Sequence, residues 1–151
     1  MRGRMDTMLA TNDDAQLILK LYELRTEAGM RTARKWVTGE FWPKSAQDVV
    51  QVLRAFGSQE NNYLRQVVSY WDMAAAFVLH GALDGSLFLD CCSENLFIFA
   101  KFWPFLNEIR VESAGFLKQT EELTIKFSSA RERVENIRKA QDSRQEQVAN
   151  R

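Results

Sequence analysis

Most of the chain's aromatic mass lies between Asn61 and Arg110, in a stretch that begins NNYLRQVVSYWDMAAAFVLHG (residues 61–81) and closes near FIFAKFWPFL (residues 97–106). In its first half, apolar side chains recur three or four positions apart, which places them on one face of a helix. These positions are Leu64, Val67, Val68, Trp71, Ala74, Ala75 and Val78. The pattern predicts a long helix that stops at Gly81 and forms the core of a small helical domain.

The composition is typical of a single globular domain. The 151 residues are 46% hydrophobic and 26% charged, and a chain of this length can bury a core without disulfides or metals. Twenty basic residues balance twenty acidic residues, so the formal net charge is zero. A balanced chain exerts no broad electrostatic attraction on nucleic acid or on an anionic membrane, and neither is expected as a partner.

Capping residues and breaks divide the chain into further helices. Thr11 or Asn12 can cap a first helix, and Ser45 can cap another, with Asp48 completing a short-armed capping box. Pro43 separates them, because proline disfavours helical geometry in the preceding residue. No segment has a sustained period of two, so no sheet is expected. The predicted fold class is all-α, a single-domain bundle of five to six helices with a long C-terminal helix.

The last part of the chain predicts this long helix and an apolar seam along it. Side chains at alternating spacings of four and three draw a heptad pattern. They are Phe116, Thr120, Leu123, Phe127, Ala130, Val134, Ile137 and Gln141. An isolated helix could not sustain such a seam in water, so it must be covered. We expect the C-terminal half of the seam, past Ala130, to be covered by the equivalent helix of a second chain or by the N-terminal stripe of Leu17, Leu21 and Leu24. The residues of the possible interaction seam are Leu123, Phe127, Val134 and Ile137.

Three regions follow from these patterns. They are a flexible N-terminus (residues 1–11), a helical bundle domain (residues 12–141) and a flexible polar tail (residues 142–151). The N-terminus has no apolar region of the length found in signal peptides. Charged residues, glycines or proline interrupt each apolar run before it reaches the ~20 residues of a membrane span. We therefore expect no transmembrane segment and a cytoplasmic location.

Residues that carry chemistry are few. His80 is the sole histidine, and with Asp84 it makes one pair four residues apart but too few ligands for a metal site. Cys91 and Cys92 are adjacent, which matches neither a redox motif nor a disulfide framework, so we interpret them as small buried side chains in a reducing compartment. The sequence has no phosphate loop, nucleophile elbow or metalloprotease motif. We expect no cofactor, no metal and no catalytic residue.

Residues 31–42 interleave basic and aromatic side chains. Such a segment can bind single-stranded nucleic acid, or its aromatic side chains can pack inward while the basic ones face water. The zero net charge favours the second interpretation. The residues concerned are Arg31, Arg34, Lys35, Trp36, Phe41 and Trp42.

Short motifs occur in order through the middle of the chain. They are Tyr70-Trp71, His80-Gly81-Ala82-Leu83-Asp84, Phe88-Leu89-Asp90, Phe102-Trp103-Pro104-Phe105-Leu106 and Arg110. Together they resemble a bacterial family catalogued only as a domain of unknown function. The resemblance covers roughly half of the chain and implies an all-helical fold. It implies no activity, cofactor or catalytic residue.

Three functions are consistent with the sequence. The leading interpretation is a non-enzymatic helical protein that binds a protein partner or self-associates into a homo-oligomer, because aromatic side chains are abundant and a seam needs cover. An alternative is a small-ligand or enzymatic pocket between helices, where buried polar groups lie among aromatic ones. Its side chains would be Trp71, Asp72, His80, Asp84 and Trp103. A third interpretation is a nucleic-acid accessory protein.

Overall fold

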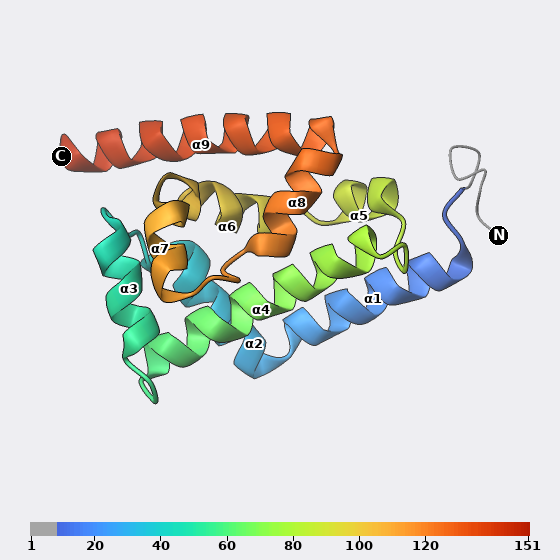
Figure 1. Ribbon diagram of the computed structural model, residues 1–151, viewed down its shortest axis with the longest axis horizontal. Helices are drawn as coiled ribbons and strands as arrows, with labels where there is room; N and C mark the ends of the chain where they lie inside the picture. The colour runs from blue at the N-terminus through green and yellow to red at the C-terminus, as the bar shows by residue number, and fades with distance from the viewer. Residues whose placement is uncertain (1–8) are drawn as a thin grey trace.

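The computed structural model describes residues 9–151, and its elements are helices (Figure 1). In chain order they are α1 (Asn12–Thr26), α2 (Ala28–Lys35), the π-helical η2 (Trp36–Glu40), α3 (Ala46–Arg54), α4 (Gln59–Leu79), α5 (Gly85–Cys91), α6 (Glu94–Phe102), the 3-10 turn η3 (Trp103–Phe105), α7 (Leu106–Glu112), α8 (Lys118–Lys126) and α9 (Ser128–Ala149). The predicted all-α class is confirmed, since no strand occurs in these residues. The expected five to six helices are too few, because short breaks split several of them.

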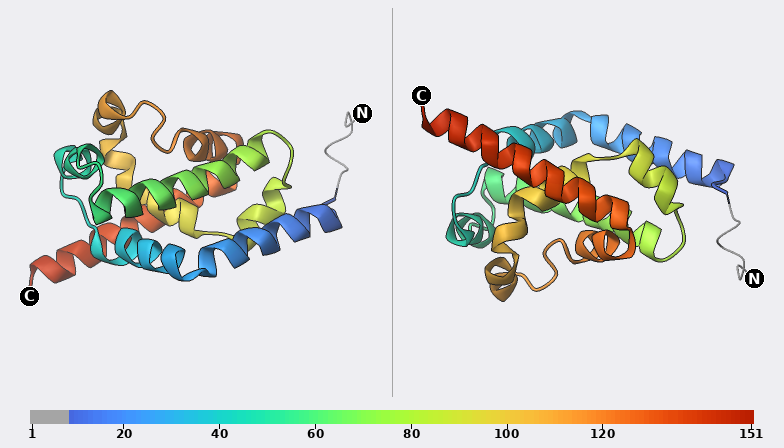
Figure 2. Two further views of the ribbon diagram at one scale, coloured as in Figure 1. Left: turned by 90° about the horizontal axis from the view of Figure 1, so that it is seen from below. Right: turned by 90° about the horizontal axis from the view of Figure 1, so that it is seen from above.

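The helices are stacked in three tiers (Figure 1, Figure 2). α1 and α2 run along one side beside α4, which runs in the opposite direction. α6 and α8 lie between α4 and α9, and α9 spans the far side of the molecule. The fully buried aromatic side chains between the tiers are Trp71, Phe88, Phe99 and Phe102. The aromatic middle of the sequence therefore supplies the core, as predicted.

α4 is the long helix predicted from the pattern in residues 61–81. Ser58 caps it by accepting a hydrogen bond from the Asn61 amide (3.1 Å). Leu64 and Trp71 of its apolar stripe are fully buried. Gly81 follows the helix with a φ of 77°, a left-handed conformation that glycine adopts without strain. The stop predicted at this glycine is therefore correct.

The caps predicted for α1 and α3 are confirmed. Thr11 Oγ1 accepts a hydrogen bond from the Asp14 amide (3.2 Å), and Asp14 Oδ2 accepts one from the Thr11 amide (2.8 Å). Ser45 Oγ accepts from the Asp48 amide (3.4 Å), and Asp48 reaches back to the Lys44 amide (2.8 Å). These contacts join residues at most four positions apart, which is why sequence alone predicts them.

The predicted long C-terminal helix is present as α9, which has 22 residues, but it begins at Ser128 and the heptad pattern from Phe116 onward is divided between α8 and α9. Phe127 has an extended backbone (φ −116°, ψ 107°) that ends α8 and precedes α9. Leu117, with a left-handed φ of 52°, lies just before α8. Figure 1 shows α9 leaving α8 at a steep angle. The heptad spacing still identified inward-facing residues, since Leu123, Ala130 and Val134 are fully buried.

α6 covers the C-terminal seam, in place of the expected second chain or N-terminal stripe. α9 packs along α6, and Gln141 Nε2 donates to the Phe97 carbonyl (3.0 Å). Val134 is fully buried and Ile137 packs against the core within one chain. α6 is apolar on nearly all sides, and a helix of this kind requires cover all round. The apolar seam from which self-association was inferred is therefore covered within a single chain.

The ends of the chain differ from the expected region boundaries. α9 continues to Ala149, past the bundle boundary expected at residue 141. Of the expected flexible N-terminus at residues 1–11, residues 1–8 lie outside the described part of the chain. None of the helices in residues 9–151 is long and apolar enough to cross a membrane.

Candidate functional site

The five side chains predicted to line one pocket lie apart. Trp71 lines a small cavity beside α1, and Asp72 lines a separate groove along α4. His80, Asp84 and Trp103 line neither of these, nor the third main cavity of the described chain. The structure therefore does not gather the five side chains into one site.

The carboxylates of Asp72 and Asp84 each lie at the N-terminus of a helix. Asp72 Oδ1 accepts hydrogen bonds from the Thr120 amide (2.8 Å) and hydroxyl (2.9 Å). Its Oδ2 accepts from the Gln119 amide (3.2 Å), so a side chain of α4 caps α8. Asp84 Oδ2 accepts from the Leu87 amide (2.8 Å) and caps α5. Both carboxylates satisfy helix N–H groups that would otherwise lack partners.

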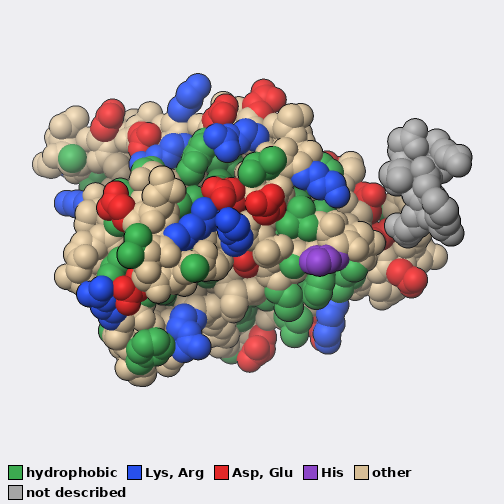
Figure 3. Space-filling view, viewed as in Figure 1, with side chains coloured by type: hydrophobic (Ala, Val, Ile, Leu, Met, Phe, Trp, Pro, Cys, Tyr) green, Lys and Arg blue, Asp and Glu red, His purple; other side chains and the backbone are tan. Residues whose placement is uncertain are grey.

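His80 and Trp103 lie outside the three cavities described for residues 9–151. His80 is exposed just after α4 and appears in purple in Figure 3, and no hydrogen bond links it to Asp84 among residues 9–151. Trp103 is half-buried and stacks on Phe99, with 6.0 Å between ring centres. The guanidinium of Arg131 covers the Trp103 ring at 4.2 Å. These contacts are those of a packed side chain.

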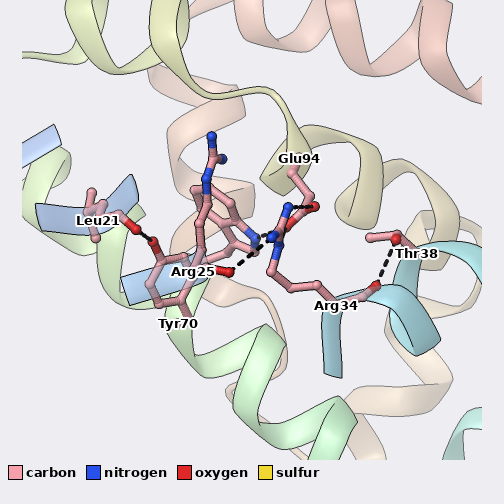
Figure 4. A network of polar contacts seen from close by, with 7 residues as sticks. Leu21, Arg25, Arg34, Thr38, Tyr70 and Glu94 are labelled. Atoms are coloured by element: carbon pink, nitrogen blue, oxygen red, sulfur yellow. Dashed lines mark hydrogen bonds and ion pairs between the residues drawn. The ribbon is translucent and has the colours of Figure 1, made fainter. Parts of the chain in front are cut away.

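An ion pair between α2 and α6 accepts a further hydrogen bond from α4, and Figure 4 shows the paired side chains of Arg34 and Glu94. Arg34 of α2 donates from Nε to Glu94 Oε2 (2.9 Å) and from Nη2 to Oε1 (2.8 Å). Trp71 of α4 donates from Nε1 to the same Oε2 (2.8 Å). The hydrogen bond to Glu94 raises the pKa of Arg34 above its ordinary value. With side chains only 22% and 18% exposed, this fork ties α2 and α4 to the start of α6.

Arg25 of α1 lines a cavity of about 150 Å³ that shares Trp71 with this network. Its guanidinium lies 4.9 Å from the ring centre of Tyr22 and 5.7 Å from that of Trp71. Arg34 Nη1 donates to the Arg25 carbonyl (3.0 Å), but nothing in residues 9–151 accepts a hydrogen bond from the Arg25 guanidinium. Figure 4 shows this guanidinium pointing away from the Arg34–Glu94 pair. Within the described part of the chain, the contacts of this guanidinium are those with the two aromatic rings.

Tyr70 and two cysteines complete the walls of the Arg25 cavity. Tyr70 Oη donates to the Leu21 carbonyl, and burial raises the Tyr70 pKa to about 12. Cys92 is buried and burial raises the pKa of its thiol, while Cys91 is exposed. A buried thiol of raised pKa is a poor nucleophile. No group of three or more metal-binding side chains occurs in the described residues.

A larger, open groove of about 920 Å³ runs along α4. The α4 residues that line its walls recur at helical spacing. They are Asn62, Arg65, Gln66, Ser69, Asp72, Met73 and Ala76. Leu64 and Val68 also line it, and Ser113, Gly115, Phe116 and Gln119 form the facing wall. The groove therefore offers apolar surface and hydrogen-bonding groups side by side.

Lys101 is a buried amine that none of the sequence patterns indicated as a site residue. It is 2% exposed, and its Nζ donates to the carbonyls of Val37 and Phe41, the latter at 2.8 Å. Nζ also lies 4.3 Å from a ring centre of Trp42. Burial lowers the Lys101 pKa to about 7. Its sequence signal is a single lysine within the apolar run of residues 96–103, a position typical of a buried lysine whose amine is hydrogen-bonded.

The aromatic side chains of residues 36–42 pack inward. Trp36 stacks on Phe41 with ring centres 4.6 Å apart, and Trp42 meets Phe97 edge-on at 6.0 Å. The neighbouring Arg34 is paired with Glu94 rather than presented to solvent. The geometry favours the interpretation of this segment as packing against the core.

Residues 10–127 match the family described as Domain of unknown function (DUF4760). The chain belongs to this family. The resemblance predicted from the short motifs is thus confirmed, over a longer span than those motifs cover. No match was found among curated proteins or solved structures.

The DUF4760 span contains helices α1 to α8 and ends at Phe127, the residue that separates α8 from α9. It includes the Arg25 cavity, the Arg34–Glu94 pair and the groove along α4. α9 lies beyond the matched residues and covers α6. The Arg25 cavity and the groove along α4 therefore both belong to the DUF4760 part of the chain.

Proposed function

We propose that this protein is a non-enzymatic helical interaction protein and that the groove along α4 receives a segment of a protein partner. The observation that carries the proposal is the size and openness of this groove. From Asn62 to Ala76 the wall is about 21 Å long at the rise of an α-helix, or about four turns. Grooves of this kind bind amphipathic helices of partner proteins.

The walls of the groove suit a protein segment. Met73, Val68 and Phe116 supply apolar contact, and Gln66 and Ser69 supply hydrogen-bonding groups. Protein interfaces combine an apolar centre with a polar rim in this way. The face in Figure 3 carries basic and acidic side chains interspersed, without a broad field of one sign. This distribution favours a partner of mixed composition over a polyanion.

One exposed aromatic side chain extends the surface next to the groove. Phe56 is 79% exposed, and the guanidinium of Arg65 lies 6.0 Å from its ring centre. Arg65 itself lines the groove. Aromatic and arginine side chains are enriched at the energetic centres of protein interfaces. Phe56 and Arg65 are therefore the residues expected to contribute most to binding.

Self-association is part of this proposal, with the groove as the contact between chains. The C-terminal seam no longer supports it, because α6 covers Val134 within one chain. Sedimentation velocity distinguishes the two forms of the proposal. A homo-oligomer appears as a mass that increases with concentration, whereas a separate partner leaves the isolated chain monomeric.

A photo-crosslinking experiment tests the groove directly. A photoreactive amino acid at Ser69 is expected to capture one defined partner, or a second copy of the chain. The substitution Met73→Glu in the same chain should abolish this product, because it places a charge in the groove. The same probe at Gln16, exposed on α1, is the matched control. Equal capture from Gln16 and Ser69, or no product in a strictly monomeric protein, would refute the proposal.

Small-ligand binding is the second candidate function, and the Arg25 cavity favours it. A ligand stabilises the fold by about 2.7 kcal/mol at one hundred times its dissociation constant, so a thermal-shift screen detects it. A nucleic-acid accessory role is the third, and binding to DNA or RNA that weakens steeply with salt would support it. We also propose a cytoplasmic location, supported by the free thiols of Cys91 and Cys92.

A further inference from the structure

The cavity beside Arg25 holds a positive charge that its surroundings do not neutralise. The nearby Arg34 and Glu94 form an ion pair with each other, and Trp71 also donates to this carboxylate. Within residues 9–151, Arg25 forms no ion pair and its guanidinium donates no hydrogen bond. Two guanidinium groups and one carboxylate leave one net positive charge at the cavity.

The helix dipole at the end of α1 does not account for the orientation of Arg25. A cation in the last turn of a helix is favoured by the helix dipole. The carbonyls there already have other donors, since Arg34 donates to the Arg25 carbonyl (3.0 Å), Arg31 to Thr26 (2.8 Å) and Tyr70 to Leu21. The Arg25 guanidinium lies instead over the rings of the cavity. Its N–H groups are left available to a ligand.

The remaining walls are mostly apolar. Leu21 and Tyr22 come from α1, Tyr70 and Trp71 from α4, and Cys92 follows α5. The one polar tip of Tyr70 is used by the Leu21 carbonyl, and Trp71 Nε1 is used by Glu94. A ligand body in the cavity therefore meets mostly carbon and sulfur surface. Among the described residues, the charged side chain that lines the cavity is Arg25, with the hydroxyl group of the largely exposed Tyr22 on the same wall.

We propose that this cavity binds a small carboxylate with an apolar body. The planar guanidinium of Arg25 presents paired N–H donors, which match the two oxygens of a carboxylate. The body would lie against Tyr22 and Trp71. A cavity of about 150 Å³ limits that body to one small ring or a short alkyl chain. This site is distinct from the α4 groove and does not depend on the function proposed for it.

Calorimetric titration with benzoate tests the proposal on the full chain. Benzoate is expected to bind with a dissociation constant in the millimolar range or below. Benzamide keeps the ring but lacks the charge, and inorganic phosphate keeps the charge but lacks the ring, so both should bind at least about tenfold more weakly. Phosphate that binds as tightly as benzoate would overturn the assignment to an apolar carboxylate.

Substitutions assign the binding to Arg25. Arg25→Gln should raise the dissociation constant of benzoate at least about tenfold. The dissociation constant for Arg25→Lys should lie between those of the native chain and Arg25→Gln, because lysine keeps the charge but lacks the paired N–H donors of arginine. Lys20→Gln removes an exposed charge from the same helix and should leave binding unchanged. Circular dichroism checks that each variant is folded. If Arg25→Gln does not fold, the binding measured for Arg25→Lys decides the test. Absence of benzoate binding to the native chain, or equal binding to the folded Arg25 variants, would overturn the proposal.

Discussion

The ring of Phe127 lies against the backbone of Gly85, so close that a Cβ built on the glycine would stand 2.3 Å from Cζ of the ring. Phe127 separates α8 from α9, and Gly85 is the first residue of α5. A side chain at residue 85 would occupy the space of the ring. This contact secures the break between α8 and α9, since the turn at Phe127 carries a large ring that packs onto another element.

Gly85→Ala should destabilise the fold by about 2 kcal/mol, because a methyl group must displace a packed aromatic ring. Urea denaturation measures the change. Gly39→Ala is the control, since nothing lies within 4 Å of a Cβ at that position. Phe127→Leu in the Gly85→Ala background should cost less than Phe127→Leu alone, because the smaller side chain relieves the clash. Equal stability of Gly85→Ala and the native chain would contradict this packing argument.

Asp72→Ala should lower the free energy of unfolding by about 1–2 kcal/mol, because α8 loses its N-terminal cap. Amide hydrogen exchange should quicken first at Gln119 and Thr120, whose N–H groups donate to Asp72. Asp90→Ala removes an exposed carboxylate and serves as the control. Unchanged exchange at both amides in Asp72→Ala would show that the cap contributes nothing to α8.

Glu94→Ala should destabilise the fold by about 3 kcal/mol, because it leaves the half-buried Arg34 without its counter-ion and Trp71 Nε1 without an acceptor. Arg54 and Glu112 provide a matched comparison, since they form the same two-bond fork on the surface. Glu112→Ala should change stability much less, because water and salt screen exposed pairs. Denaturant midpoints of the two variants decide the point, and similar losses would indicate that burial adds nothing to the Arg34–Glu94 pair.

Lys101 predicts a stability that rises with pH. Burial lowers its pKa from 10.5 to about 7, so between these values the unfolded chain binds more protons than the folded chain. The free energy of unfolding should therefore rise from about pH 7 to about pH 8.5, by at most about 1.4 kcal/mol per pH unit. Below about pH 7 the folded and the unfolded chain both hold the proton, so this contribution levels off at its lowest value.

Denaturation of Lys101→Met across the same pH range provides the control, since methionine cannot titrate. This variant should be less stable at every pH, because the Val37 and Phe41 carbonyls lose their donor, but its pH slope should be flatter. The Cys92 thiol changes stability in the opposite direction. Burial raises its pKa above the ordinary value of 9.0, so the free energy of unfolding falls as the pH rises past 9.0, and the pH range of this experiment therefore ends below that value. Parallel slopes for the native chain and Lys101→Met would remove Lys101 as the cause.

The double substitution Val134→Asp and Ile137→Asp should melt early without a change in molecular mass. It places carboxylates on the face of α9 that packs against α6, where Val134 is fully buried. Asn136→Asp adds a charge on the exposed face of the same helix and should be close to neutral. Thermal melting and sedimentation together provide the measurement. An oligomer that dissociates while its melting temperature is preserved would restore the contact between chains expected from sequence.

The structural elements that the sequence predicted correctly depend on interactions between residues that are close together in the sequence. The box of Thr11 and Asp14, the Ser45 cap and the stop of α4 at Gly81 each involve residues a few positions apart. The inward-facing side of α4 follows from the same local arithmetic of 3.6 residues per turn. The all-helical class and the identity of most core residues could therefore be read before any contact was known.

The helical break at Phe127 and the composition of each site depend on contacts between distant parts of the chain. A heptad pattern continues across Phe127, yet the helix breaks there, where the Phe127 ring packs on Gly85 and α9 turns to run along α6. Arg34 meets Glu94 across 60 residues, and Lys101 meets Val37 across 64. Periodicity specifies which face of a helix is apolar but not which element covers it. That choice is made when the helices pack together, because the free energy of burial depends on area and shape rather than on order in the sequence.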